Sequence, residues 1–257
     1  MMKIKLIAPH EQREDTLSSS FKLQRVNLPL LAALTPPGHT MTIVDEAFAP
    51  DDTNQDVDLV GITVMTDLVL RAYDIADTYR RKAVKVVMGG IHPTVLPDEA
   101  LEHADAVVVG EAEDIWPRLV SDADAGQMQR LYRAGKMTDL KGLPKPRRDL
   151  LPGIKYQGYT PIPIGVETSR GCPYDCEFCS IGQTLGHHYR VRPVQEVIAE
   201  IESIDSRHLF FVDDALGLNR NAAKKLFTEM IPLQRLWLAQ GTVSLAEGLE
   251  LLRLMRP

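Results

Sequence analysis

Short apolar runs alternate with amphipathic stretches along the first half of the chain. Five runs have the length and the Gly, Pro or charged boundaries of buried strands: residues 4–8, 41–44, 58–64, 84–88 and 106–109. Three other stretches predict helices, at residues 28–34, 67–82 and 115–120. Continuously apolar strands that alternate with helices are typical of a parallel sheet covered on both faces. The pattern therefore predicts an α/β fold of the doubly wound, flavodoxin-like kind.

In a doubly wound fold the ligand site lies at the carboxyl ends of the strands. The third strand leads to Thr63 and Thr66, and the fourth leads to Gly89, Gly90 and His92. A glycine pair at a strand end lets a ligand approach the backbone closely. We therefore expect these two loops to matter most for binding, with His92 either a ligand contact or simply a turn residue.

A Pro-rich stretch separates the two halves of the chain. Residues 140–163 contain prolines at positions 144, 146, 152, 161 and 163, a composition that breaks helices and strands alike. We interpret it as a linker between a first domain, residues 1–139, and a second, residues 164–257.

The second half shows three further strand patterns, each followed by a helix pattern. The strands are expected at residues 163–168, 208–212 and 236–240. The first helix spans residues 193–204, Asn219 is expected to cap the second, and Ser244 is expected to cap a last helix that ends near Met255. The order β-α-β-α-β-α predicts a second parallel α/β unit.

All three cysteines of the chain lie within residues 170–179, as Cys172, Cys176 and Cys179 in the order C-x3-C-x2-C. Three thiolates suit three irons of a [4Fe–4S] cluster and leave the fourth iron open, whereas most such clusters take four cysteines. The alternative is a zinc site completed by His187 or His188, although zinc usually uses paired C-x2-C motifs. A disulfide is disfavoured, because one cysteine would stay unpaired and no export signal is evident.

With Phe178 before the third cysteine, this run resembles the signature loop of the radical S-adenosylmethionine (SAM) enzymes. The resemblance implies that the open iron chelates the amino and carboxylate groups of SAM. It implies that an electron from the cluster then breaks the sulfonium to give a 5′-deoxyadenosyl radical, and that Phe178 packs near the adenine. Asp213 and Asp214 match the place in that family where the SAM amino group is received. The other interpretation of this acidic pair is a helix start favoured by the helix dipole.

The second half as a whole is similar to the first half of the radical SAM partial barrel, which normally has six β/α units. By this resemblance we expect a C-terminally truncated chain, or a barrel completed by a second copy or a partner. Arg190 and Arg192 match a basic run of the same subgroup. They are interpreted either as contacts to an anion or as surface charge.

The first half resembles the cobalamin-binding domain that precedes many radical SAM enzymes. The resemblance lies in Gly-Gly-Ile-His-Pro-Thr, followed by Pro-Asp-Glu and then Val-Gly-Glu-Ala-Glu-Asp. It implies cobalamin contacts at Thr63, Thr66, Gly89, Gly90 and His92. The D-x-H-x-x-G motif, whose histidine ligates cobalt in many cobalamin proteins, is absent, so cobalamin would bind without a protein histidine on cobalt. A Rossmann-like scaffold that has lost its ligand is the alternative.

Composition and charge narrow the function classes. The 257 residues are 44% hydrophobic and 25% charged, as in ordinary soluble globular proteins. A net charge of −6 argues against a nucleic-acid binder. No apolar run approaches the roughly 20 residues that a membrane span needs. We therefore expect a cytoplasmic protein, in a compartment that keeps thiols reduced.

These features predict a cobalamin-dependent radical SAM enzyme, most similar to the methyltransferase and cyclase subgroup, that modifies an unactivated carbon. The expected cofactors are a [4Fe–4S] cluster, SAM and cobalamin. The expected partners are a small-molecule substrate, lipid-like or a tetrapyrrole, and a reductant such as flavodoxin or ferredoxin. The alternatives are a catalytically inactive cobalamin- or cluster-binding fragment and a zinc-stabilised structural protein.

Overall fold

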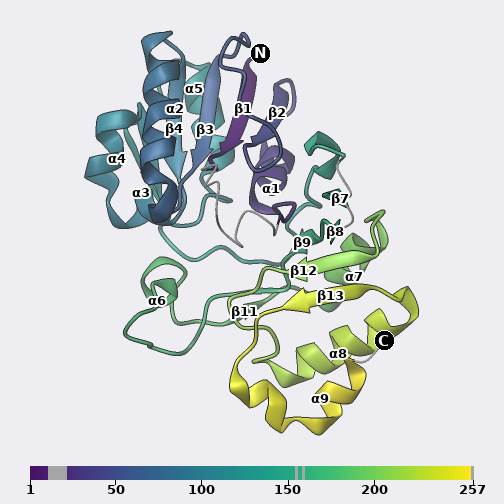
Figure 1. Cartoon of the computed structure of the whole chain (residues 1–257). Coiled ribbons are helices and arrows are strands. Elements are labelled where there is room, and N and C mark those ends of the chain that lie inside the picture. The colour runs from purple at the N-terminus through teal and green to yellow at the C-terminus, as the bar shows by residue number, and fades with distance from the viewer. Residues whose placement is uncertain (11–21, 154–155, 158–159, 256–257) are drawn as a thin grey trace. The chain divides into compact units, whose positions relative to one another are not determined.

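The computed structural model describes residues 1–10, 22–153, 156–157 and 160–255, and the chain divides into two compact units (Figure 1). Unit 1 comprises Met1–Ser20, Asn27–Thr138 and Pro144–Gly153. Unit 2 comprises Phe21–Val26, Asp139–Leu143 and Ile154–Pro257. The chain therefore enters unit 2 briefly near residue 24, and the Pro-rich stretch contributes residues to both units.

Unit 1 is built on a six-stranded parallel sheet with the order β2-β1-β3-β4-β5-β6. The strands are β1 Lys3–Ala8, β2 Thr40–Asp45, β3 Leu59–Thr63, β4 Lys85–Gly89, β5 Ala106–Val109 and β6 Leu131–Arg133. The predicted α/β class is confirmed, and five strands lie where the apolar runs placed them. The sixth, β6, was not predicted, because its three residues lie among polar ones and give too short a pattern to recognise.

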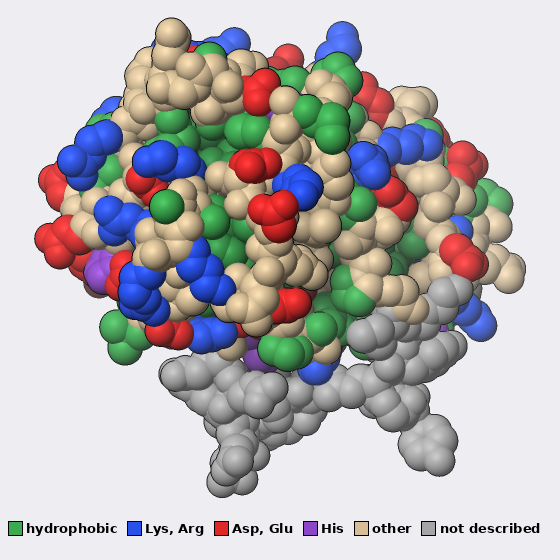
Figure 2. Space-filling model, turned by 90° about the horizontal axis from the view of Figure 1, so that it is seen from above, with side chains coloured by type: hydrophobic (Ala, Val, Ile, Leu, Met, Phe, Trp, Pro, Cys, Tyr) green, Lys and Arg blue, Asp and Glu red, His purple; other side chains and the backbone are tan. Residues whose placement is uncertain are grey.

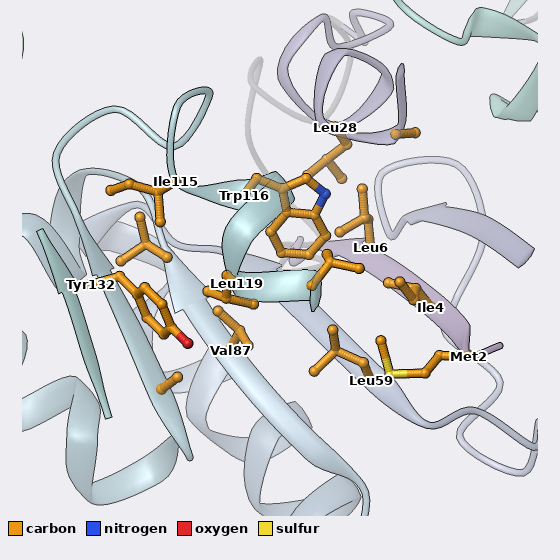
Figure 3. Close-up of a cluster of buried hydrophobic side chains, with 14 of the residues drawn as sticks. Met2, Ile4, Leu6, Leu28, Leu59, Val87, Ile115, Trp116, Leu119 and Tyr132 are labelled. Carbon is orange, nitrogen blue, oxygen red and sulfur yellow. The ribbon is translucent and has the colours of Figure 1, made fainter. Parts of the chain in front are cut away.

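Helices cover both faces of this sheet. Helices α1 (Asn27–Leu34) and α5 (Trp116–Asp124) pack on one face, while α2 (Val69–Arg81) and α4 (Pro97–His103) pack on the other. The strands serve both cores because successive side chains alternate between faces: Leu6 joins the first cluster and Ile7 the second. Figure 3 shows the first cluster, in which the Trp116 indole lies among side chains of the strands and of α1.

The segment after β4 is helical, although the glycine pair had suggested a loop. Helix α3 (Ile91–Val95) begins directly after Gly90, and α4 follows it with Pro97 in its first turn. A proline is well tolerated there because the N–H it lacks would have no partner within the helix. The short helix η2 (Thr66–Leu68) likewise precedes α2, so the predicted helix start near Asp67 holds.

Unit 2 contains a three-stranded parallel sheet in the order β13-β12-β9. Its strands are β9 Ile164–Val166, β12 His208–Phe211 and β13 Leu236–Ala239, and its main helices are α7 Val194–Glu202, α8 Arg220–Met230 and α9 Leu249–Leu254. One apolar cluster joins the sheet to all three helices. Each strand is followed by a helix, in the predicted order.

Two predicted details of unit 2 have different outcomes. Asn219 caps α8 as predicted, since its Oδ1 accepts the Ala222 N–H at 3.1 Å. Ser244 does not cap the last helix: it lies inside the short helix η5 (Val243–Glu247), and Gly248 precedes α9. A serine before an apolar stretch looks the same in sequence whether it starts one helix or sits in a preceding turn.

The Pro-rich stretch has more regular structure than its composition predicted. It contains the short helix η3 (Arg148–Leu150) and an antiparallel pair, β7 (Tyr156–Gln157) with β8 (Thr160–Pro161). Proline restricts the chain but is compatible with such short strands at a sheet edge.

Basic and acidic side chains are intermingled on the face of the molecule shown in Figure 2. The surface ion pairs include Lys3 with Asp56 at 2.6 Å and Lys85 with Asp105 at 2.9 Å. Over the part of the chain that the structure describes, every helix is too short or too polar to cross a lipid bilayer.

Candidate functional site

The cysteine loop leaves the carboxyl end of β9 and returns through a small hairpin. Strand β10 (Ser169–Arg170) pairs antiparallel with β11 (Arg190–Val191), so residues 171–189 form one excursion closed at its base. Cys172 is half-buried, whereas Cys176 and Cys179 are exposed, and all three are free thiols. The Cys179 N–H donates to the Cys176 carbonyl at 2.9 Å, which makes a tight turn between the last two cysteines.

The thiol set suits an iron–sulfur cluster. Among the described residues, no three His, Cys, Asp or Glu side chains converge where one metal ion would sit. A [4Fe–4S] cluster makes no such demand, because each thiolate binds a different iron. The candidate zinc ligands lie on the returning segment of the loop, where the His187 ring packs against Gly182 and the His188 carbonyl approaches Gly171.

Phe178 lies on the same loop with its side chain directed to solvent. It is 93% exposed, and Tyr174 on the same loop is also largely exposed. Leaving a phenyl ring in water forgoes roughly 2 kcal/mol of burial free energy. An exposed ring beside two accessible thiols is a surface on which a flat ligand can stack.

Asp213 and Asp214 follow β12 at the edge of the sheet from which the cysteine loop departs. Asp213 is 3% exposed and accepts hydrogen bonds from the Thr168 N–H at 3.1 Å, from the Thr168 hydroxyl at 2.6 Å and from the Ser169 hydroxyl. Burial raises the pKa of Asp213 to about 6, against the lowering effect of these hydrogen bonds. Asp214 accepts the Gly171 N–H at 2.8 Å. Both carboxylates therefore bond to the segment that leads into Cys172.

Two arginines of the same hairpin, Arg170 and Arg192, form ion pairs with glutamates. Arg192 is buried and pairs with Glu200 at 2.8 Å, and it also donates to the Glu167 carbonyl at 2.9 Å. Two nitrogens of Arg170 donate hydrogen bonds to the Glu167 carboxylate, at 3.0 and 2.8 Å. The interpretation of Arg192 as surface charge is therefore wrong. Sequence reasoning also missed Thr168 and Ser169, whose only signal was their place just before the first cysteine.

The predicted cobalamin contacts of unit 1 meet at the carboxyl ends of β3 and β4. Thr63 is paired with Gly89 across the two strands, and the Val64 N–H donates to the Gly89 carbonyl at 2.8 Å. Gly90 has φ +107°, and a Cβ there would lie 2.8 Å from the Val64 carbonyl oxygen. The turn therefore requires glycine. Thr66 is exposed at the start of η2, beyond this turn.

The backbone of His92 lies at this edge, whereas its imidazole points into the helix layer. The side chain is buried, and its Nε2 lies 3.1 Å from the Tyr73 hydroxyl, which also donates to Glu99 at 3.1 Å. The His92 N–H donates to the Val64 carbonyl at 3.1 Å. His92 thus anchors the glycine turn to α2 and α4. Tyr73 was missed because nothing in the helix pattern distinguishes it from a core residue.

Thr94 joins two of the strand-end turns. Its hydroxyl donates to the Gly90 carbonyl at 2.7 Å and accepts the Gly110 N–H at 3.0 Å. Large apolar side chains are exposed on neighbouring turns, namely Met65, Val95 and Leu96. Exposed apolar side chains gathered at the carboxyl ends of parallel strands are typical of a ligand-binding surface.

Comparisons with known proteins show what the chain is similar to. Residues 18–120 match the B12 binding domain family. The bacteriochlorophyllide d C-8(2)-methyltransferase of Chlorobaculum tepidum is 34% identical over 84% of this chain and 50% of its own length. The bacteriochlorophyllide d C-12(1)-methyltransferase of the same organism is 27% identical over 97% of this chain and 56% of its own length. The chain thus spans about half the length of the curated relatives it matches.

A solved structure shows the same fold. The radical S-adenosylmethionine methyltransferase TsrM of Kitasatospora setae, determined with cobalamin and a [4Fe–4S] cluster bound, superposes with a TM-score of 0.66 at 19% identity. The match covers 90% of this chain and 51% of that one. The fold and the sites define a class, proteins that combine a B12-binding domain with a cysteine-loop α/β unit. The chain is similar to cobalamin-dependent radical SAM methyltransferases and cyclases, and its residues 18–120 match the B12 binding domain family.

Proposed function

We propose that this chain binds a [4Fe–4S] cluster through Cys172, Cys176 and Cys179, with SAM on the open iron, and acts in methyl transfer to an unactivated carbon. The observation that carries the proposal is the cysteine loop itself. Three free thiols lie on one excursion at the carboxyl end of a parallel strand, above a hydrogen-bonded base. Catalytic groups of β/α barrels lie at this end of the strands.

The residues of the loop have distinct parts in this proposal. The thiols hold the cluster, and the exposed ring of Phe178 offers a face on which the adenine of SAM stacks. When bound, the cluster supplies the electron that cleaves the SAM sulfonium. The protein orients the ligands and keeps water from the reacting atoms.

We further propose that cobalamin binds at the carboxyl edge of the unit 1 sheet. Support comes from the glycine turn at Gly89 and Gly90, the hydroxyls of Thr63 and Thr66, and the exposed apolar residues beside them. The match to the B12 binding domain covers this edge. His92 contributes by holding the turn, since its imidazole is bonded to Tyr73.

The proposed substrate is a small, largely apolar molecule. The named substrates of the two methyltransferase relatives support a tetrapyrrole, and a lipid-like molecule shares the same apolar chemistry. A low-potential reductant, such as flavodoxin or ferredoxin, is proposed to supply the electron. The proposed compartment is the cytoplasm, where thiols stay reduced.

Anaerobic reconstitution with iron, sulfide and zinc together tests the metal assignment. We expect roughly four irons per chain in the wild type and loss of this iron in Cys176→Ala, with little zinc in either. Zinc without iron would instead support the zinc-stabilised structural protein.

Turnover is tested separately, by adding SAM and dithionite to the reconstituted protein. Formation of 5′-deoxyadenosine shows a working radical site. A protein that holds its iron but yields no 5′-deoxyadenosine would be the inactive cluster-binding alternative.

A further inference from the structure

Asp213 has little capacity left for an outside ligand. An ionised carboxylate accepts at most about four hydrogen bonds, and Asp213 already accepts three, two at Oδ1 and one at Oδ2. All three donors lie on Thr168 and Ser169. The side chain is 3% exposed. An ammonium group of a ligand would reach this carboxylate only by displacing bonds within the protein.

The two ends of the cysteine loop meet at Gly171. This residue has φ +84°, and a Cβ on it would lie 2.5 Å from the His188 carbonyl oxygen and 3.3 Å from that of Gly186. Its N–H donates to Asp214. Immediately before it, the β10–β11 pairing closes the base of the excursion. The entry to the loop is thus fixed on one side by the end of β12 and on the other by the returning chain.

We propose that Asp213 and Asp214 are positioning residues that clamp the entry of the cysteine loop, residues 168–171, to the carboxyl end of β12. The proposal deepens the proposed function, because the clamp gives the three thiols a preformed base. The carboxylates act through Thr168, Ser169 and Gly171, and Asp213 does not contact SAM. The clamp itself is a property of the chain and exists without the cluster.

The clamp depends on charge and on the direction of each hydrogen bond. Asp213→Asn keeps the size of the side chain, but its amide Nδ2 would face the Thr168 N–H, donor against donor. A buried donor without an acceptor is costly, whereas a charged acceptor strengthens each bond. Thr168→Val combined with Ser169→Ala removes the hydroxyl donors and leaves both carboxylates in place.

Hydrogen exchange of the metal-free protein tests the clamp directly. We expect Asp213→Asn to accelerate exchange of peptides covering residues 168–171 roughly fivefold or more, through loss of buried hydrogen bonds. Asp122→Asn is the matched control, since Asp122 accepts a hydrogen bond from Tyr132 within unit 1. It should leave those peptides unchanged. Unaltered exchange in Asp213→Asn would overturn the proposal.

Iron retention then separates positioning from ligand binding. After anaerobic reconstitution without SAM, the Asp213→Asn protein and the Thr168→Val, Ser169→Ala protein should both lose iron to a chelator faster than wild type. Their effects should be less than additive when combined, because they break the same bonds. If Asp213→Asn retained iron normally and lost only the SAM-induced change in the electron paramagnetic resonance (EPR) spectrum, Asp213 would be a SAM contact and the proposal would be wrong.

The two proposals fail in different ways. If wild type takes up no iron while Asp213→Asn still accelerates exchange, the proposed function fails and the clamp stands. If Asp213→Asn does not fold, as judged by circular dichroism, Ser169→Ala alone gives a milder test by the same exchange measurement. Normal exchange in that folded variant would contradict the clamp.

Discussion

Asp213 is a buried carboxyl group whose charge is costly to the folded protein. Burial raises its pKa from 3.8 to about 6, and the three hydrogen bonds that it accepts offset this only in part. The folded state therefore keeps a proton on Asp213 at pH values where the unfolded chain has released it. A group with a raised carboxyl pKa favours folding most at low pH, and its contribution falls as the pH rises.

The sign of this effect gives a pH prediction. Between about pH 4 and pH 6 the wild type should lose up to about 3 kcal/mol of unfolding free energy that Asp213→Asn does not lose, at 1.36 kcal/mol per pKa unit. Urea unfolding of both proteins across this range, followed by circular dichroism, measures the difference. The unfolding free energy of wild type minus that of Asp213→Asn should fall as the pH rises. A value that stays constant or increases with pH would contradict the assignment.

Gly90 gives a prediction for cobalamin binding. Gly90→Ala forces a side chain into a left-handed conformation and against the Val64 backbone, at a cost of order 1–3 kcal/mol. We expect affinity for hydroxocobalamin to fall roughly tenfold or more, as each 1.4 kcal/mol is a factor of ten. Titration followed by absorbance measures it. The control is Gly38→Ala, which has φ +95° but nothing within 4 Å, and equal affinity in both variants would refute the role of the turn.

The sequence predicted which residues lie at the strand ends better than it predicted where their side chains point. The cysteine spacing identified the thiol loop, because all three cysteines of the chain lie within ten residues. His92 and Asp213 were both placed at the correct strand ends. Their side chains turn inward, to Tyr73 and to Thr168 respectively. Direction is set by partners that lie far away in the sequence, which no local pattern reveals.

At the scale of elements, residues 22–26 add to the sheet of unit 2. Gln24 forms a parallel bridge with Ile164; its N–H donates to the Pro163 carbonyl at 3.1 Å, and its carbonyl accepts the Gly165 N–H at 2.9 Å. This contact covers the edge of β9 that β12 does not. Unpaired strand edges are a liability, and natural proteins usually cover them.

Gly165 makes this pairing possible. A Cβ at this position would lie 2.7 Å from the Gln24 carbonyl oxygen. Gly165→Ala should therefore destabilise unit 2 by about 1–3 kcal/mol, as overpacking typically does. Thermal unfolding followed by circular dichroism measures the change. Gly135→Ala, where no atom lies within 4 Å, is the control, and equal stability of the two variants would show that the bridge contributes little.

Element prediction succeeded where the hydrophobic pattern was clear and failed where it was short, polar or interrupted by Gly and Pro. The strands β1 to β5 and the helices α2, α7 and α8 all carry clear patterns. The segment β6, the helices α3 and α4, and the β7–β8 pair were missed, because each is too short to repeat a period or lies beside Gly and Pro. The contact of residues 22–26 with β9 is set by tertiary structure alone, since about 140 residues separate the two.

For the whole molecule, each unit carries one candidate cofactor site at the carboxyl edge of its own parallel sheet. In unit 1 this edge holds the glycine turn, and in unit 2 it holds the cysteine loop with its clamp. Both follow the rule that open α/β sheets bind ligands where strands end. The two sites can therefore be loaded and measured separately, with hydroxocobalamin for one and iron with sulfide for the other.

The central claim is that three thiolates hold a cluster and leave one iron open to SAM. It is tested most directly by EPR spectroscopy of the reconstituted, dithionite-reduced protein, recorded with and without SAM. The account predicts a reduced [4Fe–4S] signal whose g values shift when SAM is added, and no such signal in Cys176→Ala. A cluster signal that SAM leaves unchanged, or wild-type protein with no cluster signal at all, would contradict it.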